Sequence, residues 1–273
     1  MLTGVPISVT GMRIALFVKS NENSLGNSLV RLASGRRVNR PSDGIPEYFL
    51  SEKLRRESQS YEPVLRDIGE GLALLDVATS AGEGVFNGLT DMRELVKMYY
   101  KEDATAGDKE ACRVQFETLK TTVSSIISMS TYNGDRIIST NGGNPFKTVT
   151  LDATASPETI SIEFDAGDIA SPGTLALGAT DEATELAAVE AELGKAGSYL
   201  AKTSAYTYGL NAQYNITTTK KSVSNSASQQ GVATDTGGEM LQAVNFSIRN
   251  QSAMAMMAQA NLYTASVAKL LGW

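Results

Sequence analysis

The chain has 273 residues, of which 42% are hydrophobic and 20% are charged, which is the composition of a protein that folds around a core. A net charge of −6 argues against a general nucleic-acid or anionic-membrane binder. Histidine is absent and Cys112 is the single cysteine, which removes the commonest general base, the commonest metal ligand and any internal disulfide. We find no motif for carboxylate catalysis, and we expect no enzyme activity, no cofactor and no metal site.

The sequence also gives no sign of a membrane span or a secretory leader. No apolar run approaches the roughly 20 residues that a bilayer requires. The opening MLTGVPISVTGMRIALFVKS has no basic leader and no clear cleavage site, and Arg13 interrupts its apolar stretches. Nothing in it predicts general secretory export.

The first predicted helix covers residues 5–34 and carries an apolar stripe. Gly35 follows Leu32-Ala33-Ser34 and is a plausible stop. The stripe comprises Val18, Leu25, Leu29 and Leu32. Residues 36–46 (RRVNRPSDGIP) then predict a loop that contains Arg36, Arg37 and Arg40. We expect these arginines to be solvated or to make ionic contacts between subunits, because no aromatic residues accompany them.

A long helical pattern occupies residues 47–100, with a break predicted near Pro63. Glycines 82, 84 and 88 predict either a bend or a close helix crossing. A further helix follows the polar turn 101–108, and its heptad stripe starts at Cys112, which we interpret as a core residue. Asn133-Gly134 predicts the turn that ends this part of the chain.

The middle of the chain has a different pattern. Residues 148–154 and 159–165 alternate apolar and polar side chains, which predicts a pair of strands. Asp181 is a candidate helix cap, and a long apolar stripe follows it. Residues 217–234 are rich in Ser, Thr, Asn and Gln, which favours a loop or a weak helix.

The last predicted helix begins near Asp235. Methionines 254, 256 and 257 suit either an adaptable interface or packing within the chain, and the sequence leaves both open. Neither terminal helix can bury its apolar stripe alone, so we expect the two to pair and the remaining apolar surface to pack against other copies. The predicted contacts are Leu25, Leu29, Leu32, Leu241, Val244, Ile248, Met254, Met257, Leu262 and Leu271.

Four separated motifs resemble bacterial flagellin. They are LASGRRVNRPSDGIPEYFLSEKL at 32–54, a segment at 70–98 that ends in Met92-Arg93-Glu94-Leu95-Val96-Lys97-Met98, Thr131-Tyr132-Asn133-Gly134, and Ala258-Gln259-Ala260-Asn261 followed by Leu270-Leu271. Asp235 and Glu239 fall where the family has acidic residues before its C-terminal motif. The Arg40-Pro41-Ser42-Asp43 segment also looks like the related hook–filament junction proteins, so the alternative is a junction protein or a divergent minor flagellin.

The resemblance implies a mainly α fold in which long paired N- and C-terminal helices form a coiled-coil core and a helical rod domain, with a small β-rich insert. The implied parts are 1–45 and 235–273 for the inner core, 46–140 and 181–234 for the rod domain, and 141–180 for an outward insert. The implied function is a subunit that self-polymerises into the extracellular flagellar filament for motility.

The resemblance also implies partners and a route. These are other copies of the chain, junction and cap proteins, a cytoplasmic export chaperone at the C-terminal helix, and type III export without a cleaved leader. Met92, Arg93 and Leu95 match a segment that packs between protofilaments in the family. Gln115 stands where flagellins recognised by Toll-like receptor 5 have a Glu, which argues against that recognition here.

Overall fold

The computed structural model describes residues 9–138, 147–152, 157–164 and 170–270, and these residues are mainly helical. The chain divides into two compact units, Met1–Glu57 with Val223–Trp273, and Ser58–Ser222. The expected mainly α fold is confirmed. The elements in chain order are α1 (Val9–Ser34), η1 (Pro41–Asp43), α2 (Ile45–Tyr99), α3 (Ala106–Met129), β1 (Thr131–Tyr132), β2 (Asp135–Arg136), β3 (Lys147–Thr150), β4 (Thr159–Ile162), η3 (Pro172–Thr174), α4 (Glu182–Gln230) and α5 (Thr236–Leu270).

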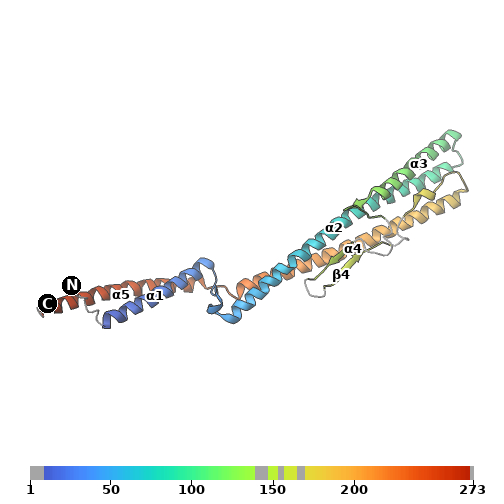
Figure 1. Cartoon of the computed structure of the whole chain (residues 1–273). Helices are drawn as coiled ribbons and strands as arrows, with labels where there is room; N and C mark the ends of the chain where they lie inside the picture. Colours follow the sequence, from blue (N-terminus) through green and yellow to red (C-terminus); the bar gives the residue numbers. More distant parts are fainter. Residues whose placement is uncertain (1–8, 139–146, 153–156, 165–169, 271–273) are drawn as a thin grey trace. The chain divides into compact units, whose positions relative to one another are not determined.

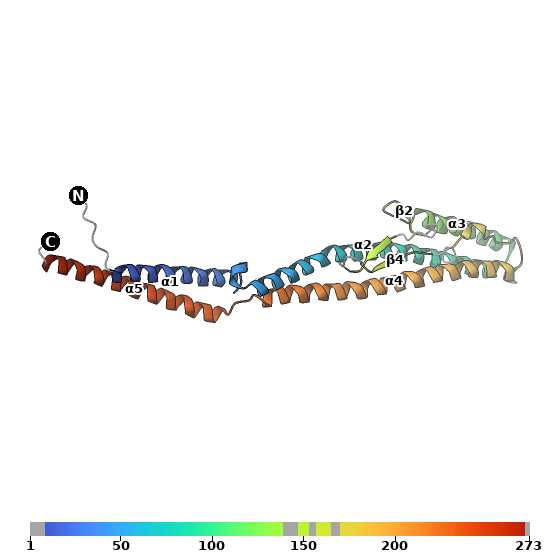
Figure 2. The same cartoon turned by 60° about the horizontal axis from the view of Figure 1, so that its bottom comes forward.

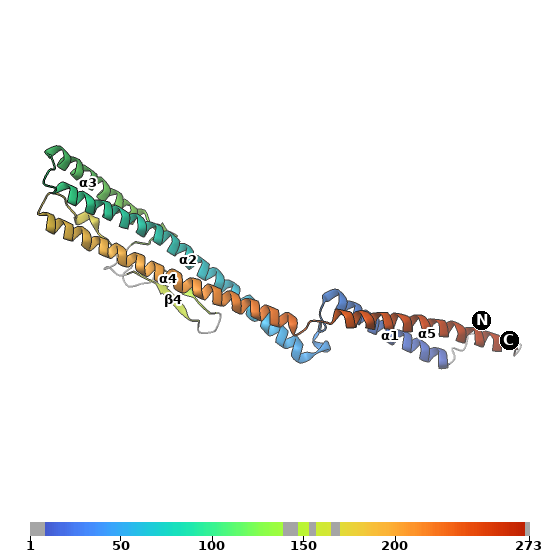
Figure 3. The ribbon, with the colours of Figure 1, turned by 180° about the vertical axis from the view of Figure 1, so that it is seen from behind.

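The first unit is built on α1 and α5, which lie side by side and run in opposite directions (Figures 1 and 3). Gly35 ends α1 as predicted, with a φ of +66° that favours glycine. Beyond it the two connecting segments bind each other, since the Arg37 N–H donates to the Val232 carbonyl at 2.6 Å and the Thr234 N–H donates to the Gly35 carbonyl at 3.1 Å. Val38 and Val232 are fully buried beside these bonds.

The second unit is a helical bundle with a hairpin packed on it. Figure 2 shows α2, α3 and α4 with the β3–β4 hairpin against the helices. The predicted strand pair is present, because β3 and β4 are antiparallel with Val149 opposite Ile160. Val149 and Ile162 of the hairpin are fully buried and join the same core as Ile68, Leu75 and Phe116. The described part of residues 141–180 therefore shares the core of the helices.

Two glycines of α2 allow close helix approaches in this unit. A Cβ on Gly82 would lie 2.9 Å from a methyl of Leu200 and 3.0 Å from the ring of Tyr199, both on α4. A Cβ on Gly88 would overlap the Val123 side chain of α3. Of the two possibilities that the sequence left open, the structure supports close crossing at Gly82 and Gly88.

Buried carboxylates attach the segment that leads into α4. Glu185 accepts hydrogen bonds from the backbone N–H groups of Gly178, Ala179 and Thr180 at 3.0, 2.7 and 2.9 Å. Burial alone would raise the pKa of this carboxyl, but the three donors outweigh it and hold the pKa below its ordinary value. Asp181 caps α4 as predicted, accepting from the Thr184 N–H at 3.2 Å.

Two expectations about helix boundaries were wrong. Helix α2 continues through Pro63 without a break, because Tyr61 and Val64 on either side of it are buried in the packed core. Helix α4 extends to Gln230, through most of the segment predicted to be a loop or weak helix. Three of its hydroxyl side chains are buried, Thr217 in the second unit and Ser224 and Ser228 in the first.

Candidate functional site

The contact between α1 and α5 contains buried polar side chains, and we call it the polar seam. It follows a heptad spacing on both helices. Asn21 lies at its centre and donates to the Phe246 carbonyl at 2.7 Å and to Oδ1 of Asn250 at 3.2 Å. The seam consists of Val18, Asn21, Leu25, Ser28 and Leu32 of α1 and Glu239, Ala243, Phe246, Asn250, Ala253 and Met257 of α5.

Large apolar side chains of the same two helices are exposed instead of buried. Leu241 is 64% exposed and Ile248 is 54% exposed, whereas the neighbouring Ala243 and Ala253 fill the seam. We call the exposed set the outer apolar surface. It consists of Met12, Leu16, Phe17, Leu29 and Val30 of α1 and Met240, Leu241, Val244, Ile248, Met254 and Met256 of α5.

The structure divides the predicted interface residues between these two faces. Leu25, Leu32 and Met257 are half-buried in the polar seam. Leu29, Leu241, Val244, Ile248 and Met254 lie on the outer apolar surface. Leu262 belongs to α5, but its side-chain surroundings are not described, and Leu271 lies outside the described residues. Whether any of them contacts another subunit stays a prediction for a single chain.

Sequence reasoning missed part of the outer apolar surface. Leu16, Phe17 and Val30 were not expected there, nor was Met240. The signal that could have found them is the heptad of small and polar residues that includes Asn21 and Ser28, because such positions mark the contact between the helices and leave the larger residues outside.

The segment predicted to pack between protofilaments lies mostly inside the second unit. Met92 is completely buried and Leu95 is buried, both in the hydrophobic core. Arg93 is partly exposed, and its guanidinium lies 3.0 Å from the Glu94 carboxylate. Of these three residues, Arg93 alone presents a polar group at the surface of the isolated chain.

The three predicted loop arginines lie between α1 and α2, as expected. The Arg36 guanidinium donates to Ser51 Oγ at 3.3 Å, and Ser51 in turn donates to the Ser228 carbonyl at 2.9 Å. Arg37 lies 3.8 Å from Glu47, and Arg40 is exposed. Arg36 therefore stabilises the junction of the first unit, while Arg40 is accessible to solvent.

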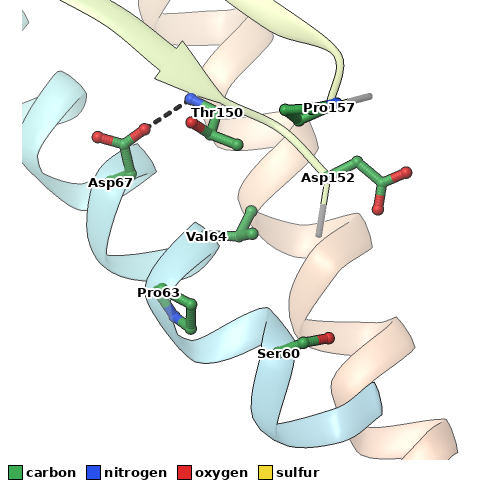
Figure 4. Close-up of a pocket in the computed structure, with 7 residues that line it drawn as sticks. All are labelled: Ser60, Pro63, Val64, Asp67, Thr150, Asp152 and Pro157. Carbon is green, nitrogen blue, oxygen red and sulfur yellow. Dashed lines mark hydrogen bonds between the residues drawn. The ribbon is translucent and has the colours of Figure 1, made fainter. Parts of the chain in front are cut away.

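An open pocket of about 570 Å³ lies where the hairpin meets α2 in the second unit (Figure 4). Two acidic residues, Asp67 and Asp152, line it, and Asp67 accepts a hydrogen bond from the Thr150 N–H at 2.6 Å and forms an ion pair with Lys147 at 2.8 Å. Burial raises the pKa of Asp67, but these two partners outweigh it and the net pKa is lowered. The carboxylate attaches β3 to α2, which is a structural role.

Comparisons with known proteins agree with this architecture. A model of the family described as bacterial flagellin N-terminal helical region matches residues 11–142. A flagellin of Halalkalibacterium halodurans is 27% identical over 92% of this chain and 93% of its own length. The chain is a flagellin relative.

Two further matches extend the comparison. A flagellin of Listeria innocua is 21% identical over 94% of this chain and 95% of its own length. A crystal structure of Bacillus cereus flagellin is matched at 21% identity with a TM-score of 0.39, covering 58% of this flagellin relative and 88% of that chain. Within the described residues, no helix has an apolar stretch long enough to cross a membrane.

Proposed function

We propose that this chain is a structural subunit of the bacterial flagellar filament and that it polymerises by covering its outer apolar surface with other copies of itself. The flagellin relatives and the family match support a filament subunit. The observation that carries the proposal is the distribution of side chains in the terminal helix pair: the seam buries Asn21, Ser28 and Glu239, while large apolar side chains such as Leu241, Ile248 and Met254 are exposed.

Isolated soluble proteins rarely expose so many large apolar residues on one helix pair. The large apolar side chains of the outer apolar surface stay exposed in the single chain, so covering them would add stabilisation beyond what the seam between α1 and α5 supplies. A second copy carries the same kind of surface, and head-to-tail contacts that do not close into a ring repeat into a helical polymer. Assembly then supplies the burial that the single chain lacks.

The proposal assigns the first unit to the inner core of the filament and the second unit to the rod domain. Arg93 is the member of the Met92, Arg93 and Leu95 segment that reaches a neighbouring copy, and the other two residues support it from the core. Arg40 is available for an ionic contact with a neighbour. An export chaperone covers the face of α5 before assembly, type III export delivers the chain, and junction and cap proteins bound the polymer.

Seeded polymerisation followed by negative-stain electron microscopy tests this function. The wild-type chain is expected to form long filaments of uniform width. A Leu241→Lys/Ile248→Lys variant places charges on the outer apolar surface and leaves the polar seam unchanged, so its helix content is retained. We expect its critical concentration for polymerisation to rise at least about 100-fold, because each lysine must lose its hydration in the contact.

A matched control is Val114→Lys, which places a lysine at an exposed apolar position of α3 in the second unit. This variant is expected to polymerise as the wild type does. A wild-type chain that stays monomeric or forms only short caps with seeds would contradict the proposed function. A double-lysine variant that elongates normally would contradict the proposed surface.

A further inference from the structure

Most of the described methionine side chains are exposed, although methionine is usually a buried residue type. Among the methionine side chains that the structure describes, Met92 is fully buried and Met257 is partly buried in the polar seam. The other six are more than half exposed: Met12, Met98, Met129, Met240, Met254 and Met256. Three of these six, Met240, Met254 and Met256, lie on α5.

Few other side chains compete for a mild oxidant. The single thiol, Cys112, is buried in the core of the second unit. The sequence contains no histidine. An oxidant that reaches the folded chain from solvent therefore meets exposed thioethers first, because oxidation of sulfur follows its accessibility.

We propose that the thioethers of Met240, Met254 and Met256 form a peroxide-sensitive modification site that controls whether the chain can assemble. The proposal rests on the proposed function, since all three belong to the outer apolar surface. Oxidation converts each flexible apolar side chain into a polar sulfoxide. A sulfoxide oxygen buried between copies without a donor opposes the contact, so the modified chain stays outside the polymer.

The reaction is balanced with hydrogen peroxide as the oxidant. The methionine sulfur uses a lone pair to attack one peroxide oxygen, an S–O bond forms, and the O–O bond breaks. The sulfur is oxidised by two electrons. A proton moves from the transferred oxygen to the departing one, which leaves as water.

Assembly and oxidation are mutually exclusive on this surface. A copy that has already joined the polymer has these thioethers covered, whereas a free copy has them exposed. Oxidation therefore acts on free subunits and not on those already placed. Enzymes that reduce methionine sulfoxide would return a modified subunit to the assembling pool.

The first test measures sulfoxide by peptide mass spectrometry after graded peroxide treatment of the folded monomer. Trypsin separates Met240 from the Met254–Met257 cluster at Arg249, and fragmentation resolves that cluster. We expect Met240, Met254 and Met256 to oxidise at least about tenfold faster than the buried Met92. In preformed filaments the same three residues are expected to be protected. Oxidation of Met92 at an equal rate, or equal oxidation of the three residues in filament and monomer, would overturn the proposal.

The second test measures the critical concentration of oxidised monomer. A rise of about tenfold or more is expected, and treatment with methionine sulfoxide reductases and dithiothreitol is expected to reverse it. The triple variant Met240→Leu/Met254→Leu/Met256→Leu keeps the apolar volume and retains Met12 on the outer apolar surface, so treatment is expected to raise its critical concentration much less than that of the wild type. The matched control Met98→Leu/Met129→Leu keeps the three α5 methionines and is expected to remain sensitive.

The outcomes separate this inference from the proposed function. Untreated wild-type chain that never polymerises counts against the proposed function. Wild-type chain that polymerises equally well before and after oxidation, or a triple variant that is as sensitive as the wild type, counts against the methionine site. If the triple variant does not assemble untreated, the reductase experiment on the wild type decides: restored assembly that tracks the loss of sulfoxide from these residues supports the site, and unrestored assembly overturns it.

Discussion

Arg31 and Glu239 form an ion pair between the two terminal helices, with Nη1 of Arg31 3.0 Å from Oε1 of Glu239. The Glu239 side chain is almost wholly buried, and among the described residues its Oε2 has no hydrogen-bond partner. The pair lies at the end of the polar seam near Gly35, whereas the hydrogen bonds of Asn21 lie farther along it. Two polar contacts at separate levels specify one register, since a sliding helix would have to break both.

Removing the Arg31 charge alone should lower the free energy of unfolding more than removing the charges of Arg31 and Glu239 together. Arg31→Met keeps the aliphatic stem but leaves the buried Glu239 carboxylate without its cation. We expect the free energy of unfolding of the first unit to fall by about 1–3 kcal/mol, measured by hydrogen exchange of amides in α1 and α5. Arg13→Met, at an exposed position on the same helix, should change it little. A double variant Arg31→Met/Glu239→Gln that is no more stable than Arg31→Met alone would contradict this account.

The Asn21 amide should specify register as well as contribute stability. Asn21→Val removes a donor from the Phe246 carbonyl and from Asn250, so we expect a loss of about 1–2 kcal/mol in the same hydrogen-exchange measurement. Asn23→Val, on the exposed side of α1, is the control. A slip of seven residues along α5 would place Asn21 opposite Ala243 or Met257 instead of Asn250, leaving its amide unsatisfied. Asn21→Val is therefore also expected to allow α1 and α5 to pair in slipped registers. Cross-linking between engineered cysteines on the two helices measures this, and a single register in the variant would contradict the role of Asn21.

Local signals in the sequence predicted several element ends, although the break at Pro63 and the end of α4 were predicted wrongly. Gly35, Asp181 and the Asn133-Gly134 turn each act through backbone geometry or a nearby donor, so a few residues determine the outcome. The side of the helix that faces its partner was harder to predict. Leu29 was expected in the same stripe as Leu25 and Leu32, yet it is exposed, because Asn21 and Ser28 occupy the contact.

The serine- and threonine-rich end of α4 shows why the remaining predictions failed. Composition favoured a loop, since these side chains compete with the helix for backbone hydrogen bonds. The facing helix α2 instead supplies hydroxyl donors to the backbone of α4: in the second unit Ser58 donates to the Lys221 carbonyl at 3.2 Å, and in the first Ser51 donates to the Ser228 carbonyl at 2.9 Å. Contacts between residues more than 160 positions apart are invisible to a local pattern.

The stability of the second unit should fall in acid in a way that depends on Glu185. Its folded-state pKa is lowered from the ordinary value of 4.5, so the carboxylate contributes stability above that pH. The contribution is lost as pH falls through the lower folded pKa, because protonation removes an acceptor from three backbone donors. Glu185→Gln should lower the denaturant midpoint at pH 7, and the difference from wild type should shrink steadily below pH 4.5. Parallel pH profiles for the two chains would rule out this role.

The two glycines Gly88 and Gly69 of α2 should respond in opposite directions to the same substitution. A Cβ at position 88 overlaps Val123, which is buried and cannot move away, whereas at position 69 nothing lies within 4 Å of the added carbon. Alanine favours a helix over glycine by about 1 kcal/mol at either site. At position 69 this gain should appear in full and raise the free energy of unfolding by about 0.5–1 kcal/mol. At position 88 overpacking costs about 1–3 kcal/mol, so Gly88→Ala should be destabilising overall. Guanidinium unfolding of the second unit measures both, and stabilisation by Gly88→Ala would show that α2 and α3 do not approach as closely as Gly88 and Val123 indicate.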